Sequence, residues 1–381
     1  MTDTYEHPEP SDRGAPAMST ADEKFFLASQ WRLMWWKFKD HRLALVSSGV
    51  VIVFYLVAVF CECLAPNDPL KRNAQRSYCP PQRVRLFHQG GLRRPFVYPQ
   101  VQHIHTETLA RTYTNDTSTT LPIRFFVKGD PYRLWGLIPM EWHVIGLPSG
   151  ERLYLLGADR LGRDLYSRVL YGSRISLSIG LVGVTISLVL GTIIGGVSGY
   201  YGGAIDTVVQ RVIEILRSFP TIPLWLALSA AMPADWSQIR VYFFMTVILA
   251  LIGWTGLARV VRGKILALRE EDYAMAAKVC GVKEFTILMK HLVPGFLSHL
   301  IVTVTLMIPG MILAETSLSF LRLGLRPPTI SWGVLLQDAQ NIRAVALYPW
   351  LMFPALFVIV AVLMFNFMGD GLRDAADPYS H

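Results

Sequence analysis

An uncharged run of 19 residues, Leu43–Cys61, constrains the fold of this chain more than any other feature of its sequence. A helix of this length, rising about 1.5 Å per residue, nearly crosses the roughly 30 Å hydrocarbon core of a bilayer. A cleaved signal peptide is the competing interpretation, but the polar region before the run is too long and no small-x-small cleavage site follows it. We therefore expect an uncleaved first membrane-spanning helix.

Five further apolar runs follow, separated by charged or Pro/Gly-rich connections. They are Ile175–Tyr200, Thr207–Met232, Val241–Val261, Phe296–Leu321 and Pro349–Met368. The run from Thr207 has Arg211, Glu214 and Arg217 near its start, which is typical of an interfacial helix that leads into the membrane. With 52% hydrophobic and 17% charged residues, the chain is too apolar for a soluble domain of its length. The sequence predicts an all-α integral membrane protein with about six transmembrane helices.

The basic residues near the short connections predict the orientation of these helices. The segment 259–290 holds seven Lys and Arg residues, whereas the connection 233–240 holds only Arg240. We therefore expect 259–290 and both chain termini in the cytoplasm, and 66–174 outside. The preference of basic residues for the cytoplasmic side holds for short connections and does not apply to long translocated segments such as 66–174. The formal net charge of +8 indicates anchoring to anionic lipid and does not favour a nucleic-acid partner.

These assignments divide the chain into five parts. Residues 1–42 form a cytoplasmic N-terminal tail with an interfacial segment, and 43–65 form a first transmembrane helix. An extracytoplasmic insertion follows at 66–174. The core transmembrane domain spans 175–370, and 371–381 form a cytoplasmic C-terminal tail. The first residues, to about Ala21, are polar and Pro-rich and should be disordered. Within the insertion, Ile123–Val127 and Arg152–Leu156 have β-like patterns.

Four cysteines, Cys61, Cys63, Cys79 and Cys280, form no C-x-x-C motif. This excludes a thioredoxin-like motif and a paired zinc knuckle, and leaves small packing residues as the simplest interpretation. Cys63 and Cys79 could form a disulfide if both lie outside the cytoplasm, a question that the sequence leaves open.

The most specific motif lies between the fourth and fifth apolar runs. It reads Asp272-Tyr273-Ala274-Met275-Ala276-Ala277-Lys278-Val279-Cys280-Gly281, with His291-Leu292-Val293-Pro294-Gly295 further on. Glu270, Glu271 and Asp272 stand where the dipole of a short helix favours negative charge, and Gly281 can supply a left-handed stop.

This motif resembles the E-A-A, x3, G, x9, I-x-L-P cytoplasmic loop of ABC import permeases, with Met275 in place of the Glu, His291 of the Ile and Val293 of the Leu. The resemblance implies a docking helix that rests in a cleft of an ATP-binding subunit. Its contact residues would be Asp272, Tyr273, Ala276, Ala277 and Gly281. An ordinary amphipathic interfacial helix is the alternative.

Three more blocks resemble the dipeptide, oligopeptide and nickel branch of these permeases. They are Leu156–Leu177, similar to L-G-T-D-x-x-G-R-D; Ile312–Leu321, similar to A-E-x-x-L-S-F-L; and Phe365–Pro378, similar to N-x-x-G-D-x-L-R-D-x-x-D-P. Arg322 stands where the branch usually has Gly. In the first block we expect Asp164 to cap a helix, and Arg168 and Arg174 to anchor it at the interface. The four blocks together imply a type I ABC importer permease fold.

Three residues of the fifth apolar run are candidates for gating: Pro309, Gly310 and Glu315. Pro309-Gly310 should kink the helix. Glu315 is an acidic residue well inside an apolar run. It should therefore face protein or a water-filled path and have a partner. A structural carboxylate and a transport role are both open.

Rival functions lack their motifs. The apolar runs offer neither H-E-x-x-H nor an Asp pair for a membrane enzyme, and no inverted repeat for a secondary transporter or channel. The closest string to a phosphate-binding loop, Arg262-Gly263-Lys264-Ile265, lacks the first Gly and the Ser/Thr of G-x-x-x-x-G-K-[ST]. We therefore expect no catalytic, cofactor-binding or metal-binding residues here, with ATP and Mg bound by partner subunits.

The resemblance implies a multi-pass permease subunit of the bacterial inner (plasma) membrane, which forms half of a heterodimeric pore with a homologous subunit. Two ATP-binding cassette subunits would gate the pore, an extracytoplasmic solute-binding protein would load it, and membrane lipid would surround it. Members of the branch import di- and oligopeptides, nickel, oligosaccharides or opine-like compounds. Peptides lead only by their frequency in the family.

Overall fold

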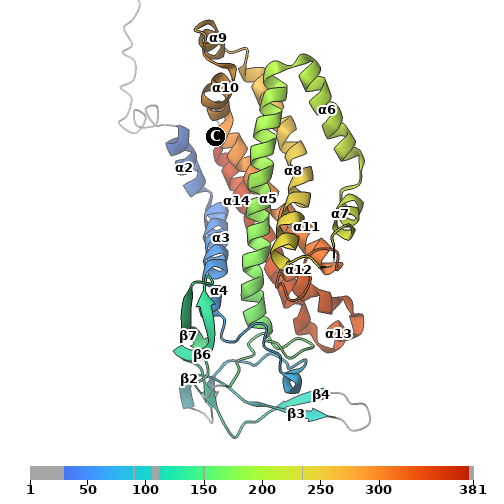
Figure 1. Ribbon diagram of the computed structural model, residues 1–381. Helices are drawn as coiled ribbons and strands as arrows, with labels where there is room; N and C mark the ends of the chain where they lie inside the picture. Colours follow the sequence, from blue (N-terminus) through green and yellow to red (C-terminus); the bar gives the residue numbers. More distant parts are fainter. Residues whose placement is uncertain (1–29, 89–90, 105–110, 149–150, 234, 377–381) are drawn as a thin grey trace, which may run out of the picture.

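The computed structural model describes residues 30–88, 91–104, 111–148, 151–233 and 235–376. The tail expected to be disordered, up to about Ala21, lies outside these residues. Over the described part of the chain, long helices form a bundle and short strands gather at one end of it (Figure 1).

Five helices in the described residues are long and apolar enough to cross a membrane. They are α3 (Arg42–Val59), α5 (Leu165–Tyr201), α8 (Gln238–Leu268), α11 (Leu297–Phe320) and α14 (Phe353–Ala376). Two further helices, α6 (Gly203–Ser218) and α7 (Thr221–Ala230), meet at 83° and make a sixth span if the bent pair is counted as one. The predicted number of about six is confirmed. The bend follows the charged turns of α6, at Pro220, which cannot continue a helical hydrogen-bond ladder.

Shorter segments connect these helices. They are α2 (Gln30–Asp40), α4 (Cys61–Leu64), η1 (Ala74–Arg76), α9 (Asp272–Val279), α10 (Glu284–Thr286), η2 (Ile287–Leu292), η3 (Val293–Phe296), α12 (Trp332–Leu335), η4 (Leu336–Gln340), α13 (Ile342–Leu347) and η5 (Pro349–Met352). Helix α9 and the strands lie at opposite ends of the bundle, and α2 lies toward the α9 end (Figure 1). Helix α14 continues to Ala376, so residues 371–376 extend the last helix and do not form a separate tail.

Helix α5 begins ten residues before the expected position, at Leu165. Its N-cap is Asp164, as predicted, whose carboxylate accepts hydrogen bonds from the backbone N–H groups of Tyr166 and Ser167. Burial raises the pKa of Asp164 to about 6, although the hydrogen bonds from Ser167 oppose the shift.

A stripe of small residues joins α5 to α8. Ser187, Gly191, Gly195 and Gly199 are spaced four residues apart and share one face of α5. A Cβ at Gly195 would overlap the carbonyl oxygen of Ala258 and lie 2.7 Å from its Cα. A Cβ at Gly199 would lie 2.8 Å from the carbonyl oxygen of Arg262. The two helices therefore pack backbone against backbone, as small residues allow in membranes.

The described residues of the inserted segment form three small antiparallel sheets. Their strands are β1 (Arg85–His88), β2 (Gly91–Val97) and β5 (Leu121–Pro122); β3 (Gln100–Ile104) and β4 (Arg111–Asn115); and β6 (Arg124–Leu134) and β7 (Ile138–Gly146). The β-like pattern at Ile123–Val127 is confirmed, because β6 begins at Arg124. The pattern at Arg152–Leu156 is wrong. This stretch forms no strand, and its Tyr154 N–H donates to the side chain of Gln82 at 2.8 Å.

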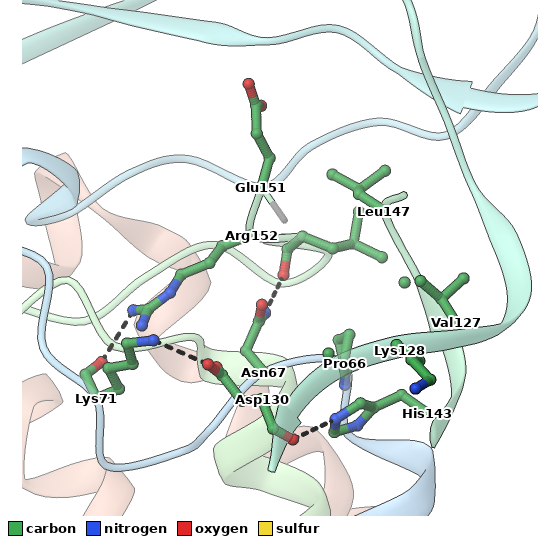
Figure 2. A pocket seen from close by; sticks show the side chains of 13 residues that line it. Pro66, Asn67, Lys71, Val127, Lys128, Asp130, His143, Leu147, Glu151 and Arg152 are labelled. Atoms are coloured by element: carbon green, nitrogen blue, oxygen red, sulfur yellow. Dashed lines mark hydrogen bonds and ion pairs between the residues drawn. The ribbon is translucent and has the colours of Figure 1, made fainter. Parts of the chain in front are cut away.

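A small cavity lies within the insertion, lined by residues of 66–71, 127–130 and 143–153 (Figure 2). Lys71 Nζ lies 2.8 Å from the carboxylate of Asp130, and His143 Nε2 lies 2.9 Å from the carbonyl oxygen of the same residue. Asn67 donates to the carbonyl oxygen of Leu153 at 2.6 Å and to Asp164 at 3.1 Å. The polar groups that line the cavity thus bond mainly to one another, which indicates a structural role for this cavity.

Cys63 and Cys79 are both free, so the disulfide left open above is absent. The Cys63 sulfur accepts a hydrogen bond from the Tyr132 hydroxyl at 3.3 Å, and the Cys79 thiol donates to the side chain of Gln100 at 2.8 Å. Burial raises the pKa of the Cys79 thiol to about 11, which keeps it protonated.

Candidate functional site

Helix α9 carries the predicted docking motif and ends as the sequence indicates. Gly281 has φ +75° and follows the C-cap Cys280. The N–H of Val282 donates to the carbonyl oxygen of Ala277 at 3.1 Å, and that of Gly281 to Lys278 at 3.0 Å. These two bonds form a Schellman motif, which needs a left-handed residue at the position of Gly281. Glu271 is the N-cap, so the acidic residues do lie at the N-terminal end.

Two small residues, Ala274 and Ala277, pack α9 against the bundle. Ala274 is only 4% exposed and packs in an apolar cluster with Ile265, Ile287 and Leu292. On the other faces, Tyr273 is 45% and Val279 is 86% exposed. Of the remaining predicted contact residues, Asp272, Ala276 and Gly281 are exposed and Ala277 is half-buried. An eight-residue helix that presents apolar side chains outward is suited to fit a cleft of another protein.

The chain after α9 leads into the membrane without a long loop. Helix α10, the π-helical segment η2 and the 3-10 segment η3 follow one another directly into α11. His291 and Pro294, from the second half of the motif, lie in η2 and η3. Departures from α-helical winding often occur at functional sites, and here they fall between α9 and a membrane span.

Arg262 of α8 and Arg269, the C-cap of the same helix, connect the α9 end of the bundle to α6 and α5, and the sequence analysis predicts neither contact. Arg269 donates to the carbonyl oxygens of Gly199 and Tyr200, each at 3.1 Å, at the end of α5. Arg262 makes a two-pronged ion pair with Asp206 of α6, with both N–O distances 2.5 Å. An acidic residue in the first turn of an otherwise amphipathic α6 was the available signal.

Glu315 has its partners inside this chain. It is fully buried in α11 and accepts hydrogen bonds from Ser176 of α5 at 3.1 Å and Ser319 at 2.8 Å. The same Ser176 oxygen accepts from the backbone N–H of Trp332, at the start of α12. The expectation that Glu315 has a partner is confirmed, and the carboxylate joins α5, α11 and α12. Helix α11 continues through Pro309 and Gly310, and the kink and gating roles stay predictions.

Replacing Glu315 with glutamine is expected to change transport or basal ATPase activity severalfold at normal expression. The amide keeps the size of the carboxylate but must donate with one end, so the Ser176 and Ser319 hydroxyls must reorient. Both rates would be measured in the reconstituted complex, with Thr185→Val on α5 as a control, because the exposed Thr185 hydroxyl bonds, within the described chain, only to the carbonyl oxygen of Leu181 in its own helix. Wild-type rates would remove the gating role, and failure to assemble would leave Glu315 purely structural.

The block 157–168 is a structural clamp. Asp159 accepts from Arg163 Nε at 2.7 Å and also pairs with Arg168, which is 3% exposed. A Cβ at Gly162, where φ is +70°, would overlap the carbonyl oxygen of Asn73. The prediction that Arg168 is an interfacial anchor is therefore wrong, because its charge is buried against Asp159.

Arg174 also has a partner in the chain. Its guanidinium makes two 2.5 Å contacts with the carboxylate of Glu62 and donates to the carbonyl oxygens of Ala58 and Val59 at 2.9 Å. Burial favours a higher pKa for Glu62, but the hydrogen bonds from Arg174 outweigh it and lower the pKa. Arg174 thus caps the end of α3.

A bundle of about six spans, with a short exposed helix before the fifth and the four sequence blocks described above in order, defines a membrane permease subunit. The chain belongs to the family of binding-protein-dependent transport system inner membrane components, whose sequence model matches residues 187–379. A second model, the N-terminal transmembrane domain of oligopeptide transport permease C, matches residues 29–81. The expected ABC permease family, the type I fold class and a multi-pass location in the inner membrane are thereby confirmed.

Curated relatives agree with this family. The chain is 42% identical over 240 residues to the oligopeptide transport system permease protein OppC of Haemophilus influenzae, an alignment that covers 62% of this chain and 75% of the relative. It is 40% identical to the dipeptide transport system permease protein DppC of Bacillus subtilis, over 61% and 70% of the two chains. It is 39% identical to the glutathione transport system permease protein GsiD of Pectobacterium atrosepticum, over 58% and 72%.

Proposed function

We propose that this chain is one of two permease subunits of an ABC importer that takes up peptides delivered by a solute-binding protein. Family membership supports the transport role, and the names of the OppC, DppC and GsiD relatives, which are oligopeptide, dipeptide and glutathione permeases, support peptides as the substrate class. The observation that carries the proposal is the exposed helix α9 with its Schellman end. A homologous subunit would supply the other half of the pore.

Two ATP-binding cassette subunits bind and hydrolyse ATP with Mg, and one of them receives α9 in its cleft. Asp272, Tyr273, Ala276, Ala277 and Gly281 make the contact. Movement of α9 then reaches α11 through η2 and η3, and α5 through Arg269. This chain binds no cofactor in the proposal and acts only by changing conformation.

The insertion lies outside and helps to receive the solute-binding protein. The opposite positions of α9 and the strands in the bundle support this, together with the basic residues of 259–290 (Figure 1). Both chain termini are then cytoplasmic, since α2 and the start of α3 pack against the end of α14 through Phe38, Ala44 and Ala375.

A cysteine in place of Thr119, as the only cysteine of the chain, is expected to react with a membrane-impermeant thiol reagent in intact spheroplasts. Thr119 is exposed in the insertion. The control is a second variant that keeps native Cys280, which is exposed beside α9, as its only cysteine. Expressed without ATPase subunits, this variant should react only after the membrane is permeabilised. The reverse labelling pattern would contradict the orientation.

The substrate class has a separate test. Calorimetry of the cognate solute-binding protein with di- and tripeptides should show saturable binding, whereas oligosaccharides, opine-like compounds and nickel should not bind. Binding of one of these three and not of peptides would replace the substrate and leave the transport machinery as proposed.

A further inference from the structure

A second polar cavity, of about 390 Å³, lies between the loop before α5, the loop after α11 and η4. Its lining includes five arginines, at 160, 163, 168, 322 and 326, and two aspartates, at 159 and 338. The formal charge of this lining is five positive minus two negative, or +3. The cavity lies at the end of the bundle that carries the inserted strands (Figure 1).

The two aspartates are already engaged. Asp159 pairs with Arg163 and Arg168, and Asp338 lies 3.3 Å from Arg160 Nε. These contacts fix Arg160, Arg163 and Arg168. No carboxylate of the cavity lining is left to pair with Arg322 and Arg326.

The remaining donors have no partner within the described chain. Arg322 and Arg326 are exposed, and no described residue makes an ion pair or hydrogen bond with their side chains. Arg168 is 3% exposed, and its Nε also lacks a hydrogen-bond partner among the described residues. A buried donor of a charged group left unpaired is costly, so the cavity favours an acceptor.

Arg322 holds its place under backbone strain. It has φ +64° and ends α11 in a Schellman motif, with the N–H of Leu323 bonded to the carbonyl oxygen of Leu318 at 3.0 Å and its own N–H to Ser319 at 3.0 Å. Glycine would be the unstrained residue at this position. An arginine there places a guanidinium at the cavity rim despite the conformational cost.

We propose that this cavity binds a carboxylate, and that the carboxylate is the C-terminal group of the peptide on its way to the pore. Guanidinium groups bind carboxylates through two parallel hydrogen bonds, and several arginines around one cavity match one anionic group better than a neutral solute. The assignment of the carboxylate to a peptide rests on the proposed function. An acidic side chain of the solute-binding protein would offer the same chemical group.

The test compares uptake of a tripeptide with a free C-terminus and of its C-terminal amide by the complete complex in proteoliposomes. The variant carries Arg322→Gly and Arg326→Gln, of which the first relieves the positive φ and so should not unfold the chain. The control is Arg343→Gln, an exposed arginine of α13 outside the cavity lining. We expect the ratio of acid to amide uptake to fall about tenfold or more in the double variant and to stay at the wild-type value in the control.

A second measurement separates the two sources of carboxylate. If the acid-to-amide ratio is unchanged but ligand-free binding protein docks about tenfold more weakly, the carboxylate belongs to that protein and the peptide assignment is overturned. If neither changes, or if the double variant no longer assembles with the homologous subunit, the carboxylate site itself is overturned. Should the wild-type complex import neither peptide, the proposed function fails, and the docking measurement still tests the cavity.

Discussion

Import is expected to fall about tenfold or more when Gly281 is replaced by valine, with the protein still inserted in the membrane. Gly281 holds φ +75° in the Schellman motif that ends α9. A β-branched residue in the left-handed region costs about 1–2 kcal/mol or more, which lowers the population of the docking-competent helix by roughly tenfold. Transport and substrate-stimulated ATPase activity should fall together, because in the proposed function both need α9 in the cleft of an ATP-binding subunit.

The matched control is Gly281→Asn, because asparagine tolerates the left-handed conformation and should keep most of the import. Ala277→Arg tests the same surface without touching the turn: a long cation at this half-buried position should block docking, whereas Ala277→Ser should not. Retained substrate-stimulated ATPase activity in Gly281→Val and Ala277→Arg would show that α9 is not the docking helix.

Replacing Gly195 with leucine should prevent the bundle from folding. Any Cβ there meets the backbone of Ala258, which cannot rotate away as a flexible side chain would. Overpacking of a core costs about 1–3 kcal/mol even where side chains can adjust, and here two helices must separate along their length. We expect little monodisperse protein in fluorescence-detected size-exclusion chromatography.

The control for this prediction is Gly263→Ala in α8, because a Cβ at Gly263 would meet no atom within 4 Å. It should be neutral or slightly stabilising, since alanine favours helix more than glycine. A Gly195→Leu protein with the yield and melting temperature of the wild type would show that α5 and α8 are not in backbone contact.

The sequence predicted well what depends on local chemistry. Charge-free runs marked the spans because a bilayer excludes charge, and the position of Gly281 marked the end of α9 because the turn needs a left-handed residue. Asp164 was recognised as a cap for the same local reason. The family blocks added the order of these features along the chain.

Contacts between side chains that are brought together only by the fold could not be predicted from the sequence. Arg168 and Arg174 seemed to end the membrane segment, so α5 was expected to begin ten residues late; their charges are in fact compensated by Asp159 and by Glu62, the latter 112 residues away in sequence. The small residues Ser187 to Gly199 were read as part of an apolar run, because their role depends on the approach of α8. The arginine cavity likewise joins residues near 160 to residues near 325.

The contact between α5 and α8 also limits how the protein can change shape. Two helices that touch at backbone distance and are bonded again through Arg269 must turn as one rigid body. The chain between them has its bend at α6 and α7, and Arg262 attaches α6 to the same body, so the joint that can open lies beyond Ser218. With a hinge at Phe219 and Pro220, a displacement of α9 would tilt α5 and α8 together as a rigid pair. Helix α7 would keep its position at the opposite membrane face.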